Sequence, residues 1–304
     1  MNKEAREFIL NFFCEQRGLS IATVSQGLAD TICAATAPYL LMVECLDQLD
    51  AENPVGGLLV TLIGRTYETS AGCLVLIALG HLREAEILSR SVFESAATTA
   101  YIVRKDPTKR LAQFFRAYVG NEREQNRKWN NDIDDLPPDV QSEHRSRIDQ
   151  KNLALDSYDR LIDGFLRHCG TSLKENDKWP NLIDRLSEIG RRVDYRTVYA
   201  AMCSQAHHDA EDILNNLLVN SLVEDNGAAK RMEQEADSFS VFLVLFGLRW
   251  FVEATRSVGA WAGFPTVVSE AAVSVERIDK ELGLIASHLD TGGFPGSWVP
   301  ESEK

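Results

Sequence analysis

The sequence predicts an all-α protein, an antiparallel bundle of long helices. Apolar residues recur at spacings of three and four along most of the 304 residues, which is the pattern of helices with one buried face. The alternation of apolar and polar residues that marks half-buried strands is nearly absent. Short connections separate the periodic segments, and such connections place consecutive helices antiparallel. The composition, 44% hydrophobic and 25% charged, is that of a globular protein.

Turn and cap residues divide this pattern into helices. In chain order, we expect helices at residues 2–17, 20–50, 58 or 67 to 104, 108–129, 147–167, 179–190, 194–223, 228–258 and 267–288. Asp106 and Pro107 suit the N-cap and the first position of one helix, and Gly190 suits the end of another. Asp194 is expected to cap the helix that follows it.

Three polar or glycine-rich stretches are expected to break the helical pattern. They are the segment around Pro54 and Gly56-Gly57, the polar residues 130–146, and Asp225-Asn226-Gly227. Residues 130–146 are the best candidate for a mobile loop. No composition shift marks a domain boundary. We therefore expect an N-terminal helical segment, 1–57, that packs on a bundle domain, 58–290, and a loosely held tail, 291–304.

The net charge and the lengths of the apolar segments limit where this protein is expected to reside and which partners it is expected to bind. The net charge of −13 disfavours broad binding to nucleic acid or to an anionic membrane. No signal peptide is expected, because charged residues interrupt each apolar run near the N-terminus, and no apolar window reaches the roughly 20 residues of a membrane helix. The six cysteines read as buried apolar side chains in a reducing compartment. These features predict a cytoplasmic protein with no membrane partner.

Charged residues form a narrow stripe on the otherwise apolar helix expected at 74–104. The stripe contains Arg83, Glu86, Arg90, Glu94 and Tyr101. Arg90 and Glu94 are four positions apart and can pair directly. Charges in a buried helix must be paired, hydrogen-bonded or directed at a cavity. The stripe therefore predicts either a structural ion pair that joins helices or a polar cleft.

A second helix, 108–129, places one carboxylate in an aromatic stripe. Glu122 shares this face with Leu111, Phe114, Phe115, Tyr118 and Trp129. Such an inward Glu is either the partner of an arginine such as Arg90 or a general base. Tyr118 is kept with it as a candidate site residue.

A third helix, 194–223, carries a histidine pair. His207 lies at the border of the core stripe, where it can hydrogen-bond an inward carboxylate. His208 with Glu211 or Asp212 has the spacing of a helical metal site, but that polar face points away from the other helices. We therefore expect no metal and no cofactor, and keep a ferritin-like carboxylate site as a distant alternative.

These segments also resemble a bacterial helical family, the domain of unknown function 5677, over roughly residues 60–220. The resemblance rests on Gly80-His81-Leu82-Arg83-Glu84-Ala85, the Arg90 and Glu94 pair, and Phe114, Tyr118 and Glu122. It continues in Trp179, Tyr195, Tyr199 and Ser204-Gln-Ala-His207. The family implies a helical fold and this choice of residues, but no activity.

A looser similarity is to the HEPN helical nucleases and nucleotide-binding proteins of bacterial defence and toxin systems. Those ribonucleases usually carry an Arg, then a polar residue and roughly four to six further positions before a His, and their site forms across a dimer. Here Arg196 precedes His207 by 11 positions, about 16 Å along one helix, so the spacing departs from that pattern. A nuclease would need Arg90 or Arg196 to meet His207 through a tertiary or dimer contact.

Two hypotheses of function follow. The first is a non-enzymatic module that dimerises or binds a protein partner and holds Arg90, Glu94, Tyr118, Glu122 and His207 in a closed polar network. The alternative is a metal-independent ribonuclease or nucleotide-binding effector of a defence or toxin–antitoxin system, with RNA or a nucleotide as ligand. In it His207 is the general acid or base and Arg90 stabilises phosphorane charge. A closed network predicts that Arg90→Ala costs roughly 3–5 kcal/mol.

Overall fold

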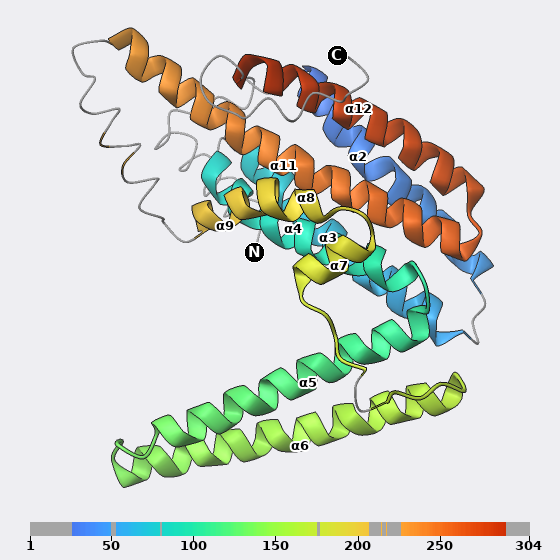
Figure 1. The fold of residues 1–304 in the computed structure, drawn as a ribbon, viewed down its shortest axis with the longest axis vertical. Helices are drawn as coiled ribbons and strands as arrows, with labels where there is room; N and C mark the ends of the chain where they lie inside the picture. The colour runs from blue at the N-terminus through green and yellow to red at the C-terminus, as the bar shows by residue number, and fades with distance from the viewer. Residues whose placement is uncertain are drawn as a thin grey trace, which may run out of the picture. The chain divides into compact units, whose positions relative to one another are not determined.

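The fold is all-α, as the sequence predicts (Figure 1). The computed structural model describes residues 26–49, 53–79, 81–174, 177–206, 214, 217 and 226–289, and no strand occurs among them. The expected helix at 2–17 and the expected tail at 291–304 lie outside these residues.

The chain forms two compact units. The first comprises residues 1–50, 58–101 and 182–304, and the second comprises 51–57 and 102–181. The boundaries at 57 and 290 drawn from the sequence do not anticipate this division, because most of the second unit, 102–181, falls within the predicted bundle domain and the rest, 51–57, within the predicted N-terminal segment. Charge and composition hardly change at its two ends, so the sequence offers no signal there.

The first unit contains most of the helices. They are α2 (Gln26–Glu44), η2 (Leu46–Gln48), α3 (Pro54–Ala78), α4 (Leu82–Val103), α7 (Leu182–Glu188), α8 (Arg192–Asp194), the π-helical turn η3 (Tyr195–Tyr199), α9 (Ala200–Ala206), α11 (Asn226–Ala262) and α12 (Pro265–Leu289). Helices α2, α11 and α12 pack side by side (Figure 1). Gly263 makes the tight connection between α11 and α12, with φ of 78°, a conformation that glycine adopts without strain.

Helix α11 supplies the aromatic centre of the first unit. The ring centroid of Phe251 lies 6.1 Å from that of Tyr39 of α2 and 6.2 Å from that of Tyr67 of α3. The two tyrosine rings stack on each other with centroids 4.3 Å apart. Trp250, the preceding residue, meets the edge of Phe93 of α4 at 5.1 Å. Aromatic contacts therefore join α2, α3 and α4 to one central helix.

One stretch of α11, Ser238–Ala262, is long and apolar enough to cross a membrane. In this structure 72% of its most apolar window is buried inside the protein. The same apolar character is required of a helix surrounded by other helices. We therefore assign this stretch to the core.

The second unit is a helical hairpin of α5 (Pro107–Asp132) and α6 (Pro138–His168), which pack side by side (Figure 1). Asp106 caps α5 as expected, with its side chain accepting a 3.0 Å hydrogen bond from the backbone N–H of Lys109. Buried residues recur at every seventh position along both helices: Ala112, Val119 and Asn126 on α5, continued by Ile133 directly after it, and Ile148, Leu155 and Ile162 on α6. This period is that of a coiled-coil seam.

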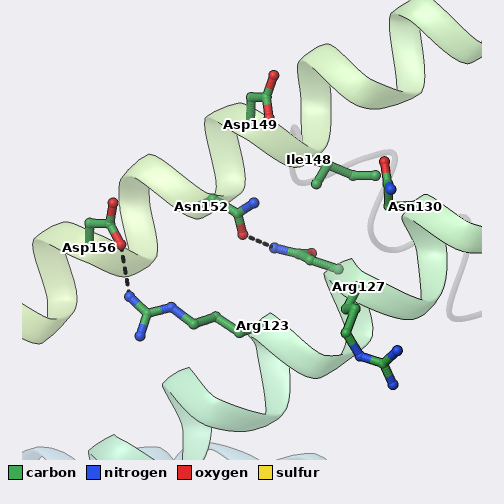
Figure 2. Close-up of a pocket in the computed structure, with 8 residues that line it drawn as sticks. Arg123, Arg127, Asn130, Ile148, Asp149, Asn152 and Asp156 are labelled. Atoms are coloured by element: carbon green, nitrogen blue, oxygen red, sulfur yellow. Dashed lines mark hydrogen bonds and ion pairs between the residues drawn. The ribbon is translucent and has the colours of Figure 1, made fainter.

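A polar layer interrupts the seam. Asn126 is only 2% exposed, and its amide donates a 2.8 Å hydrogen bond to Oδ1 of Asn152 across the hairpin (Figure 2). A groove of about 540 Å³ opens beside this pair, and its lining includes Arg123 of α5 and Asp156 of α6, which form an ion pair at 2.8 Å. An asparagine at a single core position of a coiled coil fixes the register, because any shift would bury the amide without a partner.

Several predicted element boundaries are wrong. Gly56 and Gly57 lie inside the first turns of α3 and do not break the chain. The single helix expected up to residue 104 is two helices, α3 and α4, interrupted between Ala78 and Leu82. The loop expected at 130–146 is confined to 133–137, because α6 begins at Pro138. The glycine that ends α7 is confirmed: Gly190 has a φ of 78°.

Gly247 of α11 tests the close contact with α4. A Cβ at this position would lie 3.0 Å from the carbonyl oxygen of Ser89, a backbone atom that cannot rotate away. We expect Gly247→Ala to lower the free energy of unfolding by roughly 1–3 kcal/mol in urea denaturation. Gly283→Ala on α12 is the matched control, because nothing lies within 4 Å of its added Cβ, and it should raise stability by up to about 1 kcal/mol. Equal effects of the two changes would contradict this packing.

Candidate functional site

The Arg90 and Glu94 side chains of α4 form the predicted ion pair. Nε of Arg90 donates to Oε1 of Glu94 at 2.9 Å, four residues apart on one helix. The two side chains are 26% and 41% exposed, respectively. The pair is therefore partly buried and still reachable from solvent, which places it between the closed ion pair and the open cleft that the sequence allows.

Tyr199 completes this pair from another element. Its hydroxyl donates a 2.8 Å hydrogen bond to the same Oε1 of Glu94, and it accepts a 3.4 Å hydrogen bond from Nη2 of Arg90. The Arg90 guanidinium also lies 5.5 Å from the centre of the Tyr199 ring. Tyr199 closes the π-helical turn η3, and such widened turns occur frequently at functional sites.

Aromatic stacking fixes the ring of Tyr199. Phe93, fully buried on α4, stacks on it at 5.6 Å, and Tyr195 of the same π-helical turn stacks at 5.1 Å. Because the ring is held from two directions, the hydroxyl has a defined position beside Glu94. The thiol of Cys203 also lies beside this hydroxyl.

Arg185 of α7 adds a second guanidinium to the site. It donates a hydrogen bond to the hydroxyl of Thr98 on α4. Burial lowers the pKa of Arg185, and the charge of Glu94 and the side chains of Tyr101 and Tyr199 oppose this shift. Glu94 is the carboxylate that acts on both Arg90 and Arg185. Both guanidiniums therefore lie within the electrostatic reach of Glu94.

The tyrosine contributes no negative charge at neutral pH. Burial and the hydrogen bond to Glu94 raise the pKa of Tyr199 above its ordinary value of 10.0. Arginine remains protonated in proteins. We name Arg90, Glu94, Arg185 and Tyr199 the Arg–Glu–Tyr site, and these four side chains together carry one net positive charge.

Asp194 anchors the π-helical turn to the core. It is 2% exposed and accepts hydrogen bonds from Trp250 Nε1 at 3.1 Å and from Arg191 Nη2 at 2.8 Å. The expectation that Asp194 caps the following helix is wrong, because its side chain makes no cap hydrogen bond to that helix. Its carboxylate instead holds the start of η3 against α11 and so positions Tyr199.

Glu86 belongs to the core and not to this site. It is buried, and Oε2 accepts a 2.9 Å hydrogen bond from the hydroxyl of Ser240 on α11. The stripe predicted from helical spacing is therefore divided: Glu86 faces α11, while Arg90 and Glu94 face η3.

Tyr118 and Glu122 belong to the second unit. Glu122 pairs with Lys151 of α6 at 3.0 Å, so the expectation of an arginine partner such as Arg90 is wrong. Lys151 is one turn from the α6 seam residue Leu155, within reach of Glu122 on α5. Tyr118 is 49% exposed and lies 6.4 Å from Tyr158 of α6.

The predicted histidine pair lies outside the described residues. His207 and His208 follow the last described residue of α9, and so do Glu211 and Asp212. Among the described residues, no group of His, Cys, Asp or Glu could hold a metal ion. The roles expected for His207 and His208 remain predictions.

A family model matches residues 57–229, more than half of the chain, and its description is a family of unknown function, DUF5677. The protein belongs to the DUF5677 family. No curated protein and no solved structure matches this chain. The matched region of this DUF5677 protein contains the whole Arg–Glu–Tyr site and the α5–α6 hairpin. The similarity to HEPN proteins stays a prediction.

Two members of the site, Tyr199 and Arg185, are not among the candidate site residues predicted from the sequence. Regular helical spacing directs Tyr199 to the core, and the π-helical turn shifts that spacing by one residue. Arg185 sits in a short helix with no distinguishing pattern, and only tertiary packing brings it to Thr98. The pair of tyrosines four positions apart, Tyr195 and Tyr199, was the available signal.

The solvent exposure of Glu94 determines how much free energy of unfolding is lost when Arg90 is removed. In Arg90→Ala the remaining carboxylate can be rehydrated, so we expect a loss of about 1–2 kcal/mol in urea denaturation. A closed buried network would instead cost roughly 3–5 kcal/mol. The matched control is Arg65→Ala, which breaks the exposed pair with Glu68 and should cost less than about 0.5 kcal/mol. A loss above about 3 kcal/mol for Arg90→Ala would contradict the open geometry.

Ionisation of Tyr199 is expected to lower the stability of the folded protein at alkaline pH. Its pKa is raised in the folded state, whereas an unfolded chain releases the tyrosine proton near pH 10. The stabilisation is complete below about pH 10 and is lost as the pH rises toward the folded-state pKa. We expect wild-type stability to fall more steeply than that of Tyr199→Phe between about pH 9.5 and 11, measured by urea denaturation at each pH. Parallel pH profiles for the two proteins would rule out this coupling.

Proposed function

We propose that this protein is a helical binding module whose Arg–Glu–Tyr site receives an anionic group, a carboxylate or a phosphate. The observation that carries the proposal is the guanidinium of Arg90, which Glu94 and Tyr199 hold in place while the side chain stays 26% exposed to solvent. Arg185 brings a second guanidinium to the same helix through its hydrogen bond to Thr98, and an anion at the exposed side of Arg90 would accept hydrogen bonds from this cationic site. Guanidinium groups bind carboxylates and phosphates through paired N–H donors.

The negative charge of the rest of the protein makes the positive Arg–Glu–Tyr site selective in the anions that it accepts. The protein carries a net charge of −13, which repels anions from most of its surface. A cationic site within such a protein attracts an anion only at short range, where hydrogen bonds decide which group is accepted. Tyr199 and the stacked Phe93 hold the donors in place, so less conformational freedom is lost on binding.

Binding fits the described chemistry better than proton transfer does. The raised pKa of Tyr199 keeps its hydroxyl protonated at neutral pH, so it cannot serve there as a general base. The alternative, a ribonuclease or nucleotide-binding effector, needs His207 to reach the guanidinium of Arg90. Both functions use Arg90, and they differ in their need for the imidazole.

Calorimetric titration of the full chain with inorganic phosphate and with acetate tests the proposal. We expect one of these anions to bind saturably, and the dissociation constant to rise roughly tenfold or more in Arg185→Gln and in Arg90→Gln. Arg256→Gln is the matched control: Arg256 is a partly exposed arginine of the same unit that pairs with Glu253, and its loss should leave binding unchanged. Absence of saturable binding, or equal binding by all variants, would refute the anion site.

The ribonuclease alternative has its own measurement. Single-stranded RNA is incubated with the wild type, with His207→Ala and with Arg90→Gln, after melting curves have shown that both variants fold. Cleavage that depends on both His207 and Arg90 would replace the binding proposal by the catalytic one. Anion binding without cleavage would support the binding module alone.

A further inference from the structure

The outward face of α6 lacks charged residues over a long stretch. Helical geometry of about 100° per residue places eight residues between 146 and 168 within a 100° arc opposite the α5 seam. They are Ser146, Gln150, Leu153, Ala154, Ser157, Leu161, Gly164 and His168. None is Asp, Glu, Lys or Arg, although eight such residues occur elsewhere in the same stretch. We name these residues the α6 outer face.

Two leucines on this face are unusually open to solvent. Leu153 is 68% exposed and Leu161 is 69% exposed. Small side chains separate them, and a Cβ added at Gly164 would meet no atom within 4 Å. Exposed leucines between small residues let a second helix approach closely and fill the space between them.

The spacing of these residues is symmetric about Ser157. Leu153 lies four positions before Ser157, and Leu161 lies four positions after it. If two copies of α6 pack antiparallel with their two-fold axis at Ser157, Leu153 of one copy meets Leu161 of the other. An interface of this kind is self-complementary, as the two-fold symmetry of a homodimer requires.

The charged row along one edge of the face follows the same symmetry. In the antiparallel arrangement, Asp149 of one copy comes within about two residues, or 3 Å along the axis, of Arg167 of the other. Neither residue forms an ion pair with any residue that the structure describes. Asp149 lines the edge of the groove beside α5, and Figure 2 draws no hydrogen bond or ion pair to its carboxylate. The two-fold axis repeats the pairing of Asp149 with Arg167, so two opposite-charge contacts line this edge of the interface.

We propose that the α6 outer face binds the same face of a second copy of this chain, in an antiparallel pair centred on Ser157. This goes beyond the anion site, which lies on other helices and in the other unit of the chain. The face spans 23 residues, or roughly 33 Å of helix, which is long enough for a specific helix–helix interface. The leucines supply the apolar contact, and the charged edge sets the antiparallel direction.

Sedimentation equilibrium of the full chain over a range of concentrations tests the pairing. We expect a reversible dimer in the wild type, and a dissociation constant at least a hundredfold higher in Leu153→Asp, which would bury an unpaired charge in the interface. Leu153 is largely exposed, so the variant should keep its melting temperature. A wild type that stays monomeric at every concentration would overturn the proposal, as would an unweakened Leu153→Asp dimer.

A charge exchange distinguishes this antiparallel pair from any other contact. Asp149→Arg and Arg167→Asp should each weaken dimerisation by up to roughly tenfold, and the double variant should restore it. Ser157→Cys should crosslink two copies on mild oxidation, because this position meets itself at the axis. Asn121→Cys, an exposed position on α5, is the matched control and should add no crosslink. Failure of both the rescue and the Ser157→Cys crosslink would overturn the antiparallel register.

Discussion

The double hydrogen bond to Oε1 of Glu94 is the interaction on which the site depends. This single oxygen accepts from Nε of Arg90 on its own helix and from the hydroxyl of Tyr199 on η3. It thereby joins a local contact, set by helical spacing, to a long-range contact across 105 positions of sequence. The carboxylate of Glu94 is therefore committed to two donors.

The geometry of Tyr199 is determined at a distance by a buried carboxylate. Asp194 lies in the core and receives hydrogen bonds from Trp250 and Arg191. A buried carboxylate without such donors would be strongly destabilising, so these contacts fix the start of η3 on α11. The π-helical turn that follows brings Tyr195 and Tyr199 onto one stack. The position of the hydroxyl beside Glu94 therefore follows from packing in the core.

Helical periodicity correctly predicted contacts between residues of one helix. It failed for contacts between helices, because tertiary packing sets them. The pairing of Arg90 with Glu94 and the cap at Asp106 follow from spacings of three and four residues, and both are confirmed. The partner of Glu122 is set by the register of α5 against α6, which a single sequence does not reveal. An arginine was predicted as this partner, and the structure has Lys151 instead. The recruitment of Arg185 depends likewise on how a short helix meets α4. The expected convergence of inward charges occurs in the first unit, but with Tyr199 and Arg185 as members and without Tyr118 or Glu122.

The packing of the α5–α6 hairpin does not explain why the α6 outer face lacks charged residues. Between α5 and α6 the charged side chains satisfy one another: Arg116 pairs with Asp159 and Asp163, and Arg123 with Asp156. The seam beneath them is apolar except for the asparagine layer that fixes its register. These internal contacts already account for the pairing of the two helices, so they place no requirement on the α6 outer face. Solubility alone would favour charge at such exposed positions, and the leucines at 153 and 161 run against that preference. Burial against a second helix is the physical condition under which exposed leucines and small residues become favourable, and the symmetric spacing about Ser157 is the arrangement that an identical helix can satisfy.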